Sequence, residues 1–304
     1  VIYYGPGPTY CPSDYLLTDN TYVIRGEPEE SLKELCWALD NGSDLKSVLG
    51  LSYRHNGKIR ENGFRPLIEQ IDSLPFQAIG LIEGEKYKYC NPKLGAKPVA
   101  SAITSRNCPY QCIYCVPCSL SFARELEYKR FHNNKKPPVG RRSAKNVIKE
   151  IEMLARNGYR AITFHDDLFI MGKERTIEIC RGIEKYSLRW GCATRADTID
   201  DDVVKAMSRA GCQYIDLGIE SFDQRILEDI RKDMDVECIE RSIKIIKRHG
   251  IKAKLNILLG ASPLETVETI QYSMRKVKEV DADQVMYNIA NPFPGTELYK
   301  LAKQ

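Results

Sequence analysis

The sequence contains no apolar run that approaches the ~20 residues needed to cross a bilayer, and no secretory signal peptide is visible. Basic and acidic residues nearly balance, which leaves a net charge of only +4 and no compositional case for a nucleic-acid partner. Eleven cysteines in a chain without a secretory signal indicate a reducing compartment. We therefore expect a cytoplasmic protein with no membrane span. Because the chain begins with Val1 rather than Met, we also expect it to be part of a longer protein.

Four of the cysteines fall within eleven residues, in the stretch CPYQCIYCVPC from Cys108 to Cys118. Cys108, Cys112 and Cys115 have the spacing C-x3-C-x2-C, and Tyr114 precedes the third of them. Thiolates this close on one loop can converge on one metal centre, and iron–sulfur clusters are held by cysteine thiolates. Three such ligands on a four-iron cluster leave one iron open, and an open metal position is where chemistry can take place.

The same thiols allow other interpretations. Buried cysteines can act as small hydrophobic residues, although four so close together are unusual in that role. A structural zinc site with Cys118 as the fourth ligand is a second alternative. Zinc sites of this kind are usually built from two C-x2-C pairs, and no second pair is present. Disulfides are disfavoured in a reducing compartment.

From Val99 onward the sequence repeats a strand, a loop and a helix. Several helical patterns end at a glycine, as at Gly158, Gly211 and Gly250, which is typical of a left-handed residue just past a helix. Alternating strands and helices predict a parallel sheet with helices outside, and ligands then bind at the carboxyl ends of the strands, where the cysteine loop lies. The predicted strands are 99–104, 161–164, 189–193, 214–217, 252–258 and 284–289, and the predicted helices are 144–157, 173–186, 200–210, 236–249 and 264–280.

The first 95 residues show no such repeat. Two strands with a short connection, a turn at Gly5–Pro8 within it, cannot form a domain, so we expect residues 1–26 to be the end of an open α/β sheet. A hairpin is predicted around Asn56-Gly57. The strands predicted in this part are 1–4, 21–24, 51–54 and 58–60, and the helices are 29–39, 45–49 and 67–74.

The cysteine spacing, with an aromatic residue before the third thiol, resembles the signature of the radical S-adenosylmethionine (radical SAM) superfamily. The resemblance implies a 4Fe–4S cluster on Cys108, Cys112 and Cys115, with S-adenosylmethionine (SAM) chelating the fourth iron. One electron then cleaves SAM to methionine and a 5′-deoxyadenosyl radical. The resemblance also implies an α/β fold with a partial (β/α)6 radical SAM barrel over residues 96–304, and the segment NPFPGTELY near the end is similar to the one that closes this module.

The part before the barrel resembles one large class of this superfamily, in which a cobalamin-binding domain precedes the radical module. On this resemblance, residues 1–26 are the C-terminal remnant of a Rossmann-like cobalamin-binding domain and residues 27–95 are a helical linker. The D-x-H-x-x-G signature of some cobalamin domains does not occur, and the four histidines lie in other contexts. The resemblance implies cobalamin as a further cofactor of the full-length protein.

Polar side chains at the ends of the predicted strands are candidate cofactor contacts. Asp166 and Asp167 resemble the family segment that binds the ammonium group of SAM, which a carboxylate suits, and a helix cap is the alternative. Arg195 suits the carboxylate of SAM because a guanidinium binds carboxylates in a bidentate way, and a surface ion pair is the alternative. Glu220 suits the ribose hydroxyls of SAM, as an acidic residue does in dinucleotide folds.

Weaker candidates complete the predicted site. Ser221 belongs to the same family segment as Glu220, but with Gln224 it also predicts a capping box. Tyr114 is a candidate stacking surface beside the adenine, and Cys118 is predicted to be a bystander.

Ile257 and Gly260 fall where the family lines its adenine pocket, while Ser262, Pro263 and Glu265 predict the cap of the following helix. His165 is predicted to be a packing or hydrogen-bonding residue. The segment KRFHNNKKPPVGRR, residues 129–142, predicts a solvated basic surface loop.

The class implies methyl transfer from methylcobalamin to an unactivated carbon or phosphorus of a small-molecule or peptide substrate, in an oxygen-sensitive enzyme. A flavodoxin- or ferredoxin-type protein would donate the electron. Ring formation or rearrangement is an alternative. Methylthiolation of transfer RNA or protein is another, but Cys11, Cys36 and Cys90 are scattered rather than gathered for a second cluster. A zinc-stabilised binding module is the non-enzymatic alternative.

Overall fold

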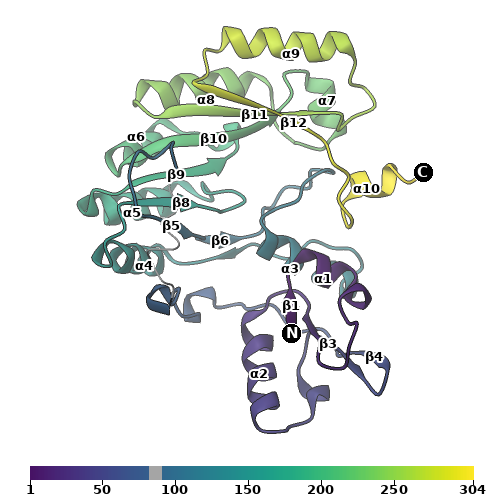
Figure 1. Cartoon of the computed structure of the whole chain (residues 1–304). Helices are drawn as coiled ribbons and strands as arrows, with labels where there is room; N and C mark the ends of the chain where they lie inside the picture. The colour runs from purple at the N-terminus through teal and green to yellow at the C-terminus, as the bar shows by residue number, and fades with distance from the viewer. Residues whose placement is uncertain (82–90) are drawn as a thin grey trace.

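The structure is a computed structural model that describes residues 1–81 and 91–304. Its larger part is a sheet of six strands in which every neighbouring pair is parallel (Figure 1). The order in space is the order in the chain, so the carboxyl ends of all six strands lie at one edge, where such folds bind ligands. The strands are β5 (Val99–Ala102), β8 (Ala161–Phe164), β9 (Arg189–Thr194), β10 (Cys212–Glu220), β11 (Lys252–Leu259) and β12 (Gln284–Ile289).

Amphipathic helices cover the outer face of this sheet (Figure 1). In α8, for example, Ile239, Ile243 and Ile246 are buried at helical spacing, so one stripe of the helix contacts the sheet. The core surrounds the fully buried Trp190, whose indole N–H donates a hydrogen bond to the carbonyl of Ala210 at 2.8 Å. The outer helices are α4 (Ala144–Arg156), α5 (Lys173–Ile183), α6 (Asp201–Arg209), α8 (Glu237–Arg248) and α9 (Val267–Glu279). The predicted α/β fold with its repeat of strands and helices is confirmed.

A smaller four-stranded sheet precedes the barrel. β1 (Ile2–Tyr4) and β2 (Tyr22–Ile24) are parallel, while β3 (Leu51–His55) and β4 (Lys58–Glu61) continue the sheet as an antiparallel hairpin. Helix α2 (Glu29–Asp40) packs Leu35 and Ala38 against it. The predicted strands and hairpin are therefore present, and residues of the predicted remnant and the predicted linker share one sheet.

Helix α3 (Ser119–Phe131) joins the two parts, because it follows the cysteine loop directly and contacts α1 (Pro6–Tyr10) below it (Figure 1). The fully buried Arg25 at the end of β2 donates from Nε to the Glu127 carboxylate of α3 at 2.9 Å. The small sheet thus holds the helix that carries the cysteine loop.

Some local predictions were wrong. The turn at Gly5–Pro8 is instead the beginning of α1, because Pro6 suits the first helical position and Thr9 N–H donates to the Gly5 carbonyl at 3.1 Å. The helix predicted over 67–74 is only a 3-10 turn at Ile71–Ser73. The strand predicted over 99–104 ends at Ala102.

Helix α3 was not predicted because its buried residues include the charged Arg124, Glu125 and Glu127, so no apolar stripe marks it. It takes in the first residues of the predicted basic loop. The end of that loop forms β7 (Gly140–Arg141), which pairs with β6 (Ser105–Arg106). The short helix α10 (Glu297–Leu301) was also missed, and α7 (Gln224–Asp229) was expected only through the capping box predicted at Ser221 and Gln224. Across the ranges the structure describes, no helix combines the length and the apolar character needed to span a membrane.

Gly191 in β9 offers a test of the packing inside the sheet. A Cβ atom at this position would be 2.2 Å from the ring of the buried Tyr214 in β10. We expect Gly191→Ala to lower the free energy of unfolding by roughly 1–3 kcal/mol, as overpacking does, measured by denaturant unfolding. Gly63→Ala is the matched control, because its Cβ would be in ordinary contact with Leu49 at 3.7 Å. Equal effects of the two substitutions would contradict this packing.

Candidate active site

A cavity of about 470 Å³ lies between the cysteine loop and the carboxyl ends of β8, β9, β10 and β11. Backbone hydrogen bonds hold the loop in place: Ile113 N–H donates to the Ile230 carbonyl at 3.1 Å, and Leu298 N–H donates to the Ile113 carbonyl at 3.0 Å. The cavity brings together most of the predicted site. The predicted residues that line it are Cys108, Cys112, Tyr114, Cys115, Asp166, Asp167, Arg195 and Glu220.

The three predicted cluster ligands line this one cavity. Burial raises the pKa of Cys108, and burial together with the neighbouring Cys112 raises the pKa of Cys115 to about 12. Cys108 and Cys115 are therefore held as neutral thiols until a metal centre displaces their protons. Within residues 1–81 and 91–304, no group of three or more histidine, cysteine or acidic side chains is close enough to hold a single metal ion. Thiols spaced along one loop are the type of ligand by which iron–sulfur clusters are held.

Cys118 also lines the cavity, but its contacts differ from those of the other three cysteines. It precedes the first residue of α3, its backbone N–H donates to Asp167 at 2.6 Å, and its thiol donates to the Ser121 hydroxyl at 3.3 Å. That Cys118 is not a cluster ligand stays a prediction, and these contacts support it.

The two adjacent aspartates after β8 have different surroundings. Asp166 is almost fully buried and accepts hydrogen bonds on both oxygens, from the backbone N–H and hydroxyl of Thr104 and the hydroxyl of Ser105. Asp167 accepts from Cys118 N–H through Oδ1, but its Oδ2 is buried without a hydrogen-bond partner among the described residues. Burial raises the pKa of both carboxyl groups. Asp166 therefore ties β8 to the segment after β5, and Asp167 has the oxygen that remains for a ligand.

The guanidinium N–H groups of Arg195, which follows β9, donate hydrogen bonds to other groups of the protein. Its Nε and Nη2 donate to Asp197, and its two terminal nitrogens donate to the backbone carbonyls of Lys232 and Asp233 at 2.7 and 2.8 Å. The guanidinium lies 3.5 Å from the ring centre of Tyr110. Burial opposes its charge, but hydrogen bonds and the charge of Asp197 outweigh burial and raise the pKa of Arg195. Five N–H groups with four strong partners leave little for bidentate binding of a ligand.

A buried ion pair that the sequence did not reveal lies beside the cysteine loop. Lys232 is 5% exposed, and its Nζ donates to Glu220 at 2.8 Å and to the Tyr114 hydroxyl at 3.3 Å. Glu220 has a left-handed backbone with φ of 63° after a bulge in β10, which turns the chain at the strand end. Lys232 follows α7 in a loop with no periodic pattern, so nothing local in the sequence marks it. The cavity thus contains a cation for which the described residues provide partners to two of its three N–H groups.

Three predicted site residues lie outside the cavity lining. Ser221 is buried and accepts a hydrogen bond from Asp223 N–H at 3.0 Å. Ile257 is buried in the core, and Gly260 N–H donates to the Glu265 carboxylate at 2.6 Å.

The capping boxes predicted at these strand ends were wrong. Asp223, not Ser221, caps α7 by accepting from Arg225 N–H. Helix α9 begins at Val267, where Thr266 and Thr269 form the reciprocal capping box, while Ser262 instead donates to Asp229 at 2.6 Å. In both cases the cap lies a few residues later than predicted, because the loop takes more residues to leave the strand.

Charged residues also occupy the inner face of the sheet, beyond the predicted site. Lys93 and Lys254 both donate to Oδ2 of Asp216, at 3.4 and 3.3 Å, and Oδ1 of Asp216 has no partner among the described residues. Burial and the neighbouring Lys254 lower the pKa of Lys93. Strand alternation could have revealed Asp216, because Ile215 and Leu217 on either side of it are fully buried in the core. Asp216 lines the cavity, so the cavity is polar on this side too.

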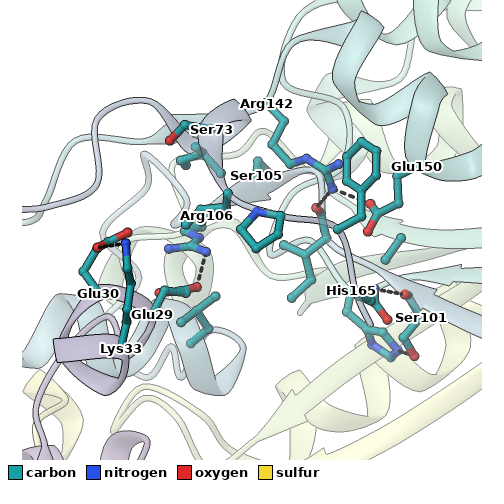
Figure 2. Close-up of a pocket in the computed structure, with 18 residues that line it drawn as sticks. Glu29, Glu30, Lys33, Ser73, Ser101, Ser105, Arg106, Arg142, Glu150 and His165 are labelled. Atoms are coloured by element: carbon teal, nitrogen blue, oxygen red, sulfur yellow. Dashed lines mark hydrogen bonds and ion pairs between the residues drawn. The ribbon is translucent and has the colours of Figure 1, made fainter. Parts of the chain in front are cut away.

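A larger cavity of about 750 Å³ lies between α2 and β5, but its charges neutralise one another. Figure 2 shows Arg106 pointing to Glu29, Arg142 to Glu150 and Lys33 to Glu30. His165 faces Ser101, with Nε2 3.2 Å from the hydroxyl oxygen, as the prediction of a hydrogen-bonding histidine requires (Figure 2). Although Glu29 Oε2 has no hydrogen-bond partner among the described residues, the charged side chains are paired and no thiol is among the lining residues, so this cavity is the weaker candidate.

The radical SAM superfamily model matches residues 102–277, more than half of the chain, and the chain belongs to this superfamily. The family's cofactors are a 4Fe–4S cluster and SAM, which agrees with the thiols and ionic groups around the cavity.

Two curated relatives match most of the chain. It is 36% identical over 92% of its length to an uncharacterized methyltransferase of Pyrococcus horikoshii, and 27% identical over its whole length to an anaerobic magnesium-protoporphyrin IX monomethyl ester cyclase of Synechocystis. The chain spans 57% and 58% of the lengths of these two relatives.

Solved structures show the same fold. The radical SAM methyltransferase TsrM of Kitasatospora setae, with tryptophan and a SAM analogue bound, superposes with a TM-score of 0.77 over 98% of this chain and 57% of that one, at 19% identity. The cobalamin-dependent radical SAM enzyme OxsB, with aqua-cobalamin bound, superposes with a TM-score of 0.74 over 100% of this chain and 42% of that one, also at 19% identity.

The Lys232–Glu220 pair can be tested by a double-mutant cycle on unfolding. Either Lys232→Met or Glu220→Gln leaves a buried group unpaired, so we expect each to lower the free energy of unfolding by about 3 kcal/mol. The double variant should recover part of that loss, because no uncompensated charge remains. Additive losses in the double variant would show that the two side chains are not coupled.

Proposed function

We propose that this chain is the radical module of a cobalamin-dependent radical SAM methyltransferase that acts on an unactivated centre of a small-molecule or peptide substrate. The observation that carries the proposal is the single cavity lined by the three loop thiols and by Asp167, Glu220 and Lys232. When bound, the cluster and SAM supply the radical chemistry, and the protein supplies binding and orientation.

Each end of the methionyl part of SAM has a matching group in this cavity. Lys232 suits the carboxylate, because only two of its three N–H groups have partners among the described residues, while most donors of Arg195 are engaged. Asp167 Oδ2 suits the ammonium, since this buried oxygen has no partner among the described residues. Arg195 and Asp166 then act as positioning residues.

Glu220 suits the ribose hydroxyls, because its Oε1 accepts from Lys232 and its Oε2 accepts no hydrogen bond from another described residue. The Tyr114 ring is the candidate surface for the adenine, and burial raises the pKa of its hydroxyl, so it stays a neutral donor. Ser221, Ile257 and Gly260 contribute by holding the strand ends that form the wall. Proximity of the substrate to the adenosyl group then depends on these contacts.

We infer cobalamin binding and methyl transfer from the proteins that this chain resembles. The Pyrococcus horikoshii relative is named a methyltransferase, and OxsB is named cobalamin-dependent. We infer that β1 and β2 end a cobalamin-binding domain over residues 1–26, that β3 and β4 belong to a linker over 27–95, and that the full-length protein works in a reducing cytoplasm with a flavodoxin- or ferredoxin-type donor. The cysteine thiolates that hold the cluster would make the full-length protein oxygen-sensitive.

Ring formation is the second candidate, because the Synechocystis cyclase matches the chain over its whole length. Methylthiolation is less favoured: Cys11 follows α1 and Cys36 lies in α2, so they belong to separate elements, and Cys90 lies outside the described residues.

The proposal is tested by anaerobic reconstitution of the full-length protein with iron and sulfide. After reduction with titanium(III) citrate and addition of SAM, we expect 5′-deoxyadenosine, measured by chromatography. Cys112→Ala should lose the cluster, as judged by iron content and visible absorbance, because one of three thiolates is gone.

Cys118→Ala is the matched control and should retain the cluster, since the Cys118 thiol donates a hydrogen bond to the Ser121 hydroxyl. Loss of the cluster in this variant would show that the ligand set is wrong. An intact cluster that cleaves no SAM would refute the radical assignment.

The two aspartates should separate binding from folding. We expect Asp167→Asn to weaken SAM binding about tenfold, the size of a hydrogen bond to a charged group, with little loss of stability. Asp166→Asn should instead lower the free energy of unfolding by about 2 kcal/mol, because an amide N–H₂ would face the donors of Thr104 and Ser105. Calorimetric binding and denaturant unfolding measure the two effects, and the reverse pattern would contradict the assigned roles.

A further inference from the structure

The cysteine loop separates two cavities. Cys112 and Cys115 line the cavity described above, and they also line a second cavity of about 470 Å³. The other walls of the second cavity come from α3, the segment that follows α3, and the residues before and at the start of α10. A partner can therefore approach a cluster held by these thiols through the second cavity, without entering the ligand cavity.

Three lysines surround this second cavity, and the backbone fixes their arrangement. Asn133 and Asn134 have left-handed φ angles of 49° and 60°, which turn the chain back after α3. Asn134 N–H donates to the Lys129 carbonyl at 3.0 Å, and the Lys136 ammonium donates to the carbonyl of Tyr110 in the cysteine loop. We call Lys129, Lys135 and Lys136 the lysine rim.

The lysine rim carries more positive charge than its neighbours neutralise. The buried Glu125 accepts from Lys129 at 2.5 Å and lies 3.7 Å from Lys136, so one carboxylate serves two lysines. Lys135 is exposed and has no ion-pair partner in the part of the chain that the structure describes. Glu297 on the opposite wall is paired with Arg231 at 2.7 Å. The excess is therefore positive and faces solvent beside two cluster thiols.

We propose that the lysine rim is the docking surface for an acidic protein that carries one low-potential electron. The inference rests on the proposed function, because it presupposes the cluster. In the docked complex one electron leaves the carrier, which is oxidised, and enters the cluster, which is reduced, while no proton or group is transferred. Complementary charge speeds such encounters, and the carrier leaves the ligand cavity undisturbed.

The test uses the full-length protein, with oxidised flavodoxin as the binding probe and reduced flavodoxin as the donor. We compare Lys135→Glu, the double variant Lys129→Glu/Lys135→Glu, and Lys244→Glu, a matched charge reversal on the exposed face of α8. Calorimetry measures the dissociation constant at low ionic strength, and stopped-flow absorbance measures cluster reduction. A parallel arm with ferredoxin tells which carrier type the rim accepts.

We expect Lys135→Glu to weaken binding and slow reduction by the accepted carrier roughly tenfold, and the double variant more, with a smaller salt dependence in both. Lys244→Glu and reduction by titanium(III) citrate should be unchanged. The inference is overturned if Lys135→Glu behaves like Lys244→Glu with both carriers, if titanium(III) reduction slows equally, or if the rim binds an RNA oligonucleotide and neither carrier. Failure of the proposed function is a separate result, in which titanium(III)-reduced wild type yields no 5′-deoxyadenosine.

Discussion

One buried carboxylate, Glu27, holds both ends of the cysteine loop. Arg106, two residues before Cys108, donates to Glu27 at 2.6 Å, and Nε of Arg124, six residues after Cys118, lies 3.1 Å from the same oxygen. The second oxygen of Glu27 accepts from Ile68 N–H. Two cations on one buried anion are favourable only while all three are present, because the removal of any one leaves buried charge uncompensated. Glu27 lies just after strand β2 of the small N-terminal sheet. The position of the thiols therefore depends on this sheet as much as on the barrel.

The cavity beneath the loop keeps its charged groups at a cost in solvation. Asp167 Oδ2 and Asp216 Oδ1 are buried without partners among the described residues, and Lys232 is buried against Glu220. A buried oxygen without a donor costs about 1–3 kcal/mol, and a fold maintains such atoms when their hydrogen bonds are completed by a ligand. Asp166 and Arg195, whose donors and acceptors are nearly all used, instead make the walls rigid. Within this cavity, the contrast between satisfied and unsatisfied groups is the basis on which we propose some residues as supports and others as ligand contacts.

The sequence predicted the parts of this arrangement that depend on local periodicity. Alternating strands and helices predicted the parallel sheet, and the cysteine spacing predicted the thiols that line the cavity. Prediction failed where a residue's environment is set by distant contacts: α3 buries charges that pair with Arg25 and Lys129, so it lacks an apolar stripe. Lys232 reaches Glu220 only because of the left-handed turn at Arg231 and Asp233. Arg195 has the residue type for a carboxylate, but its charge is used by Asp197 and by two loop carbonyls that no spacing rule indicates.

The same loop geometry explains how two kinds of partner can reach one metal centre. Ile113 is held through its backbone by Ile230 and Leu298, so the loop lies between α7 and α10 and has a cavity on each side. On the side of the strand ends the charged groups are buried or half-buried and of both signs, with four carboxylates and two cations, which suits a zwitterionic small molecule that must be enclosed. On the side of the lysine rim the charge is exposed and in excess, which suits a protein that must bind and leave quickly, since exposed charges act mainly on association rates. Because Cys112 and Cys115 line both cavities, an electron carrier can approach the thiols without entering the ligand cavity.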